Sequence, residues 1–126
     1  MSPLLSLRGL TRTFQVPHAP DLHILTGVDL DVEPGEHIAI VGRSGTGKST
    51  LLNILGLIDQ PTSGTYTLED QDAPRLSEGR RARLRGATFG FVFQSFNLIE
   101  GLSTTENVAA PLLYDTGRSF WTRTAR

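Results

Sequence analysis

One short segment spaces glycine, lysine and serine as a phosphate-binding loop requires. The stretch "GRSGTGKST" (42–50) fits the pattern Gly-x-x-x-x-Gly-Lys-Ser, ending in Gly47, Lys48 and Ser49. In such a loop, glycines let consecutive backbone N–H groups turn toward phosphate oxygens, and the loop opens a helix whose N-terminus favours an anion. The spacing therefore predicts a P-loop that binds nucleotide phosphates.

Lys48 is the only lysine of the chain, which has eleven arginines. A compact ammonium on a flexible stem can follow the β- and γ-phosphates, whereas the planar guanidinium fits that narrow space poorly. Ser49 offers a hydroxyl oxygen to Mg²⁺, which prefers oxygen ligands. We therefore predict Lys48 as a catalytic residue and Ser49 as a metal ligand. The predicted phosphate-binding residues are Gly42, Arg43, Ser44, Gly45, Thr46, Gly47, Lys48, Ser49 and Thr50.

A P-loop must follow a strand and open a helix, and the flanking residues fit both elements. The run "HIAIV" (37–41) is apolar and β-branched, and "STLLNILGL" (49–57) spaces its apolar residues as a helix does. Further strands are predicted at 4–10, 28–32, 65–68 and 87–93, a turn at 33–36, and helices at 77–85 and 103–114. This order indicates an α/β fold with an antiparallel extension.

Composition limits the function classes. The 126 residues suit one domain, and a net charge of −1 gives no overall reason to expect nucleic acid as a partner. Without cysteine, neither disulfides nor thiolate metal sites can form. His18, His23 and His37 lack metal-ligand spacing. The basic cluster at 75–85 has helical spacing, so we interpret it as a solvated face.

Three longer segments carry a family resemblance. They are "GVDLDVEPGEHIAIVG", "LLNILGLIDQPTSGTYTLEDQD" and "FGFVFQSFNLIEGLSTTENVAAPL". From about Leu5 to Leu113 the chain resembles the N-terminal part of an ABC transporter ATPase subunit, of the macrolide-exporter and lipoprotein-release type. The resemblance implies a P-loop NTPase core with an N-terminal antiparallel β extension. Residues 1–126 would be part of one nucleotide-binding domain.

The resemblance also implies site residues and cofactors, namely ATP and Mg²⁺. Phe14 falls where the family places an aromatic that stacks on adenine, although a core phenylalanine is the alternative. Gln94 falls at the glutamine of the Q-loop, where its amide oxygen ligates Mg²⁺ or helps to hold the attacking water. We therefore predict Gln94 as a catalytic residue and metal ligand.

The same resemblance implies partners. Residues 94–107 would contact a transmembrane permease subunit through Phe96, Leu98, Ile99 and Leu102, unless these side chains fold inward and cap the sheet. A second nucleotide-binding subunit would pair head to tail with this one. The expected location is the cytoplasmic side, at the inner face of the cell membrane.

Parts of the family's hydrolytic machinery are absent from the sequence. The chain contains no strand ending in Asp-Glu and no "LSGGQ" signature. It therefore resembles a domain truncated before these motifs, with apolar faces exposed, that binds Mg·ATP without hydrolysing it. A non-catalytic remnant or regulatory module and a small-molecule kinase are the alternatives. A GTPase would need a second lysine for its guanine-reading Asn-Lys-x-Asp.

Overall fold

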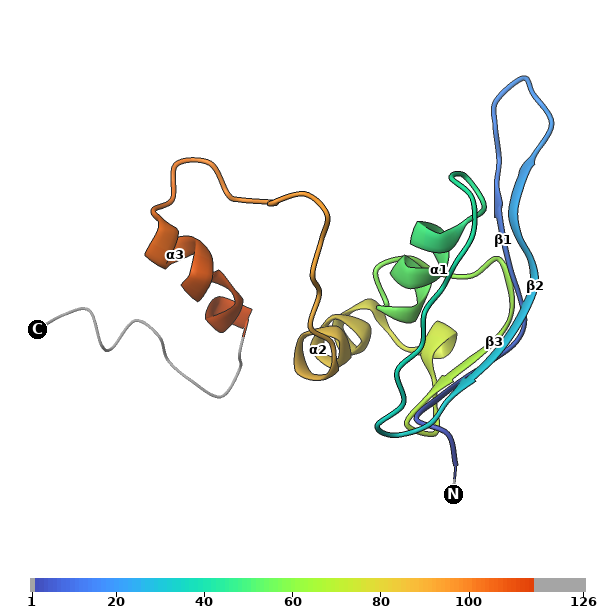
Figure 1. Ribbon diagram of the computed structural model, residues 1–126, viewed down its shortest axis with the longest axis horizontal. Helices are drawn as coiled ribbons and strands as arrows, with labels where there is room; N and C mark the ends of the chain where they lie inside the picture. Colours follow the sequence, from blue (N-terminus) through green and yellow to red (C-terminus); the bar gives the residue numbers. More distant parts are fainter. Residues whose placement is uncertain (1, 115–126) are drawn as a thin grey trace, which may run out of the picture. The chain divides into compact units, whose positions relative to one another are not determined.

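The computed structural model describes residues 2–114, which divide into two units, the first ending at Arg85 and the second beginning at Gly86. The strands are β1 (Leu5–Phe14), β2 (Leu22–Val32), β3 (Ser63–Leu68) and β4 (Gln71–Asp72). The helices are α1 (Lys48–Leu55), α2 (Glu78–Thr88) and α3 (Thr104–Ala109), with 3₁₀ turns η1 (Ala73–Arg75) and η2 (Ala110–Tyr114) (Figure 1).

The first unit contains a four-stranded antiparallel sheet in the order β2-β1-β3-β4. In β1, Leu5 pairs with Val32 of β2 on one side and with Leu68 of β3 on the other. Leu5, Leu7 and Leu10 of this central strand are buried. The strands predicted at 4–10, 28–32 and 65–68 are confirmed. All three are longer than predicted, and β1 and β2 continue as a paired ribbon beyond the predicted segments.

Helix α1 packs against this sheet and confirms the helix predicted at 49–57. Its apolar residues Leu51 and Ile54 are buried. The hydroxyl of Tyr66, in β3, donates to the carbonyl of Leu55 at 2.6 Å. Burial raises the pKa of Tyr66, so this hydroxyl remains a donor. The helix that follows the glycine-rich loop is thus fixed to the sheet.

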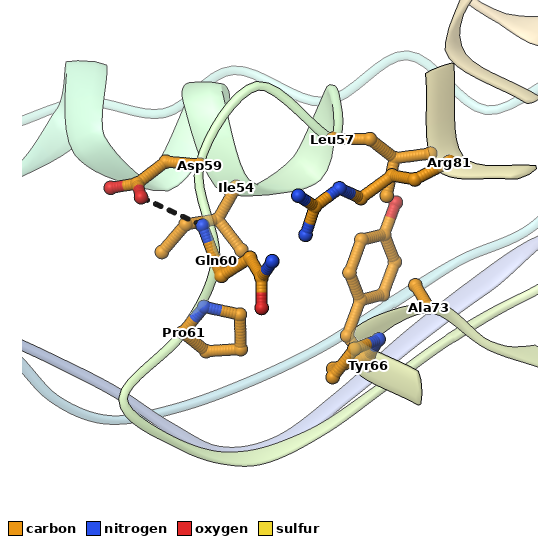
Figure 2. Close-up of a pocket in the computed structure, with 9 residues that line it drawn as sticks. Ile54, Leu57, Asp59, Gln60, Pro61, Tyr66, Ala73 and Arg81 are labelled. Atoms are coloured by element: carbon orange, nitrogen blue, oxygen red, sulfur yellow. Dashed lines mark hydrogen bonds between the residues drawn. The ribbon is translucent and has the colours of Figure 1, made fainter. Parts of the chain in front are cut away.

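Two arginines of α2 bind the segment that follows α1. Arg81 is only 8% exposed and pairs with Glu78, one turn earlier. Figure 2 shows its guanidinium reaching toward the side-chain amide of Gln60; with the amide oxygen and nitrogen of Gln60 exchanged, the oxygen accepts from both Nη atoms. Nη1 of Arg85 donates to the carbonyl of Leu57 at 2.7 Å. The predicted solvated face is therefore wrong for these two arginines, because they bind protein groups; the exposed ones are Arg75, Arg80 and Arg83.

Two predicted strands, 37–41 and 87–93, are not found. Neither segment has a partner strand among residues 2–114, and an extended segment forms a strand only by pairing its backbone groups. Val41 and Val92 are accordingly 88% and 101% exposed, as expected for apolar faces left uncovered. Phe89, Phe91 and Phe93 instead form a row of rings, the last two stacked at 5.5 Å between centroids.

In the second unit, a loop from 94 to 103 leads into α3. Ser103 caps this helix: its Oγ accepts from the N–H of Glu106, whose carboxylate accepts from the N–H of Ser103 at 2.8 Å. Hydrogen bonds from Ser103 hold the pKa of Glu106 below its usual range. The predicted start at Ser103 is confirmed. The predicted helix changes to the 3₁₀ turn η2 at Ala110, because Pro111 has no N–H for an α-helical bond.

Candidate functional site

Glycine makes the turn from the loop into α1. Gly47 is the N-cap residue at φ 96°, and Gly45 has φ 79°, a region that side chains rarely adopt. A Cβ on Gly47 would lie 2.8 Å from Cγ2 of Ile24 and 3.0 Å from Cδ2 of Leu25. Only glycine fits here, and its contact with β2 fixes the loop against the sheet.

The side chain of Lys48 curls back over the loop. Its Nζ donates to the carbonyls of Gly42 and Arg43, at 2.7 Å each. The Arg43 carbonyl also accepts from Oγ1 of Thr46 at 2.7 Å. Both acceptors of Lys48 are neutral, so these contacts orient its charge without neutralising it.

An open hollow of about 440 Å³ lies at the start of α1. It is lined by Ile24, Ser44, Gly45, Gly47, Lys48, Ser49 and Thr50. The N–H groups in the first turn of a helix have no intrahelical acceptor, and within the described residues no side chain caps those of α1. The positive end of the helix dipole lies at this same end of α1. Gly42, Arg43 and Thr46, which were also predicted to bind phosphate, do not line the hollow. Donors without acceptors, together with one ammonium, fit a phosphate chain.

Ser49, the predicted metal ligand, is exposed and lines the hollow. Across residues 2–114, no cluster of three or more His, Asp or Glu side chains could hold a metal ion. A cation there would take the Ser49 oxygen, phosphate oxygens and water. That set suits Mg²⁺, which keeps several waters and binds substrate phosphates.

Phe14 lies at the end of β1, opposite Leu22 of β2. It is 37% exposed within the first unit, and its role in stacking on adenine stays a prediction. It does not line the hollow. The guanidinium of Arg12 lies over its ring, 4.3 Å from the centroid. Arg12 was not predicted as a site residue, because its contact with Asp59 depends on residues distant in the sequence.

Gln94 is exposed and belongs to the second unit, whereas Ser49 belongs to the first. Their shared Mg²⁺ therefore stays a prediction. The second unit also carries an open groove of about 510 Å³ along residues 96–108. Within the second unit its apolar side chains are exposed; they are Phe96, Leu98, Ile99, Leu102 and Val108. We call the groove that these five side chains line the apolar groove.

Asn107 holds the loop that forms this groove. Its Oδ1 accepts from the N–H of Ile99 at 2.8 Å, and its Nδ2 donates to the carbonyls of Leu102 and Ser103 at 3.2 and 3.1 Å. This role of Asn107 was not predicted from the sequence. The available signal was an asparagine in a short helix just after a loop, where its amide can reach back to backbone groups.

A family model described as "ABC transporter" matches residues 25–126. The chain belongs to the ABC transporter family. A similar ABC transporter is the macrolide export ATP-binding/permease protein MacB of Azoarcus sp. (strain BH72), 50% identical over 113 residues. The pyoverdine export ATP-binding/permease protein PvdT of Pseudomonas syringae pv. tomato (strain ATCC BAA-871 / DC3000) is 45% identical over 113 residues. Each match covers 90% of this chain but 17% of the relative, so the chain spans about a sixth of their length.

Solved ABC cassettes share the fold. The dimeric, post-hydrolysis cassette MJ0796, bound to ADP and Pi, has a TM-score of 0.84 and 36% identity, over 91% of this chain and 49% of that one. The predicted family and fold class, an ABC ATPase core with an antiparallel β extension, are therefore confirmed. Among the residues that the structure describes, no helix has the length and apolarity to cross a membrane.

Proposed function

We propose that this part of the chain binds Mg·ATP, as the nucleotide-binding portion of an ABC transporter ATPase that couples ATP binding and hydrolysis to export or lipoprotein release. The observation that carries the proposal is the hollow at the start of α1, where Lys48 and uncapped N–H groups meet. The similar cassette bound to ADP and Pi supports the same class of ligand.

Each predicted residue has a role in this proposal. Nζ of Lys48 exchanges its carbonyl acceptors for oxygens of the β- and γ-phosphates, while the first-turn N–H groups bind the same chain. The hydroxyl of Ser49 ligates Mg²⁺, which when bound offsets negative charge on the phosphates. The amide oxygen of Gln94 would be a further ligand of this metal ion or would help to hold the attacking water. Phe14 stacks on adenine.

The apolar groove would receive the transmembrane part of the transporter. A contiguous set of exposed apolar side chains marks an interaction site, and Asn107 gives this one a defined backbone. The relatives named above are ATP-binding/permease proteins, and the similar cassette is dimeric. On this basis the cassette lies at the cytoplasmic face of the membrane and pairs head to tail with a second copy.

The 126 residues are expected to bind Mg·ATP and to release phosphate no faster than background. They contain neither the Asp-Glu strand end nor the signature loop that hydrolysis requires. Calorimetry measures binding, with AMP as the control because it lacks the β- and γ-phosphates, and a phosphate-release assay measures turnover. Turnover of about 1 s⁻¹ or faster would contradict the second expectation. Equal binding of AMP and ATP would contradict the first.

Phe14→Ala is expected to weaken binding of ATP and GTP alike, by about 1–2 kcal/mol. A ring face offers stacking area but no base-specific hydrogen bond, so both purines should lose the same contact. Calorimetry with both nucleotides measures the effect. Phe96→Ala is the matched control, since it removes an exposed ring from the second unit. A Phe14→Ala variant with unchanged ATP affinity would show that the ring does not stack on the base.

A further inference from the structure

Arg12 contacts both the candidate adenine-binding ring and the segment that follows the phosphate-loop helix. On one side, its guanidinium lies 4.3 Å from the ring centroid of Phe14, within the range of a cation–π contact. On the other side, Nε and Nη2 each donate to one oxygen of the Asp59 carboxylate at 2.9 Å. The guanidinium of Arg12 thus links the end of β1 to the segment that follows α1.

The pair with Asp59 is geometrically defined. Both N–H groups of the guanidinium edge bind one carboxylate, which fixes the plane of the guanidinium as well as its position. The side chains of Arg12 and Asp59 are only 22% and 30% exposed. The same carboxylate accepts from the N–H of Gln60, as Figure 2 shows, and the N–H of Asp59 donates to the carbonyl of Asn53 in α1. The carboxylate is therefore anchored to the end of α1.

The other arginine on β1 provides a comparison for the contacts of Arg12. Arg8 also pairs with an aspartate, Asp31, at 2.7 Å, but these side chains are 54% and 44% exposed and only one nitrogen takes part. No ring contact is found for Arg8 among the described residues. The contact with Phe14 and the bidentate pair are thus properties of Arg12 and not of every arginine on this strand.

We propose that Arg12 is a positioning residue for nucleotide binding: held by Asp59, it covers one face of Phe14 and orients the ring so that the base can stack on the exposed remainder. This inference rests on the proposed function. The ring is the last residue of β1 and is 37% exposed, so strand pairing alone leaves its orientation loosely determined. The link through Asp59 sets the ring's position relative to the helix that carries the phosphate loop.

The test compares ATP with inorganic tripolyphosphate, which has the phosphates but no base. Arg12→Ala is expected to weaken ATP binding about 3–10-fold, the size of a lost aromatic contact, and to leave tripolyphosphate binding unchanged. In a Phe14→Ala background, Arg12→Ala should cause no further loss. Arg8→Ala is the matched control, because it removes the same charge from the same strand and should change neither affinity.

Two milder variants test the same link if Arg12→Ala destabilises the fold. Arg12→Lys keeps the charge but cannot form the bidentate pair, and Asp59→Asn removes the charged acceptor. Both should lose ATP affinity while retaining tripolyphosphate affinity. Full ATP affinity in both, an equal loss for both ligands, or tighter ATP binding would overturn the inference. Wild-type protein that binds neither ligand would instead reject the proposed function itself.

Discussion

Lys48→Ala is expected to remove most of the affinity for ATP. The ammonium is held over the loop by two neutral carbonyls, and no other lysine exists in the chain to replace it. Hydrogen bonds to a charged group contribute about 1.5–3 kcal/mol each, so losing two bonds from Nζ to phosphate oxygens in the proposed complex should weaken binding by about 3 kcal/mol or more, roughly 100-fold. Isothermal calorimetry with Mg·ATP measures this loss directly.

Two further variants make the Lys48 result specific. Arg75→Ala removes a cation whose side chain is 87% exposed and should leave ATP affinity unchanged. Lys48→Arg keeps the charge but replaces a point charge by a planar fork, so it should restore only part of the affinity. Equal affinity of wild type and Lys48→Ala would reject the phosphate site. Thermal unfolding of each variant shows whether the loop's own hydrogen bonds were lost as well.

Replacing Leu98 and Ile99 together by serine is expected to prevent assembly with the transmembrane part while ATP affinity stays intact. These side chains are 68% and 53% exposed in the apolar groove. Burying such a side chain contributes about 1.5–3 kcal/mol, so the double change should cost several kcal/mol of association free energy. The measurement uses the full-length protein with its transmembrane partner, and scores complex formation and nucleotide binding separately.

Ile58→Ser provides the matched control for this experiment. Ile58 is also exposed, at 45%, but lies in the first unit after α1, so its loss should leave assembly unchanged. Intact assembly of the double variant would show that the groove does not dock the partner. Loss of ATP binding together with assembly would indicate a folding role for Leu98 and Ile99.

The phosphate loop could be predicted from sequence because its chemistry is local. Gly47 needs a positive φ, Lys48 follows it directly, and the helix begins at once, so neighbouring residues determine the geometry. The start of α3 was predictable for the same reason, since Ser103 and Glu106 cap it within one turn. Such features depend little on distant parts of the chain.

Features that depend on residues far apart in the sequence were either not predicted or predicted wrongly. The segment 37–41 has the composition of a strand, but a strand also requires a neighbour, which composition does not report. Arg81 looked like part of a charged helix face, yet its environment depends on where Gln60 lies. The contact of Arg12 with Asp59 joins residues 47 positions apart, and no periodicity reveals such a pair.

The row of phenylalanine rings has a consequence for the behaviour of the protein in solution. The run from Gly86 to Ile99 has no charged residue, and Arg85 and Glu100 flank it. Its exposed, β-prone segment around Val92 therefore lacks the internal charges that discourage self-association. Aggregation at high protein concentration should therefore begin at this run.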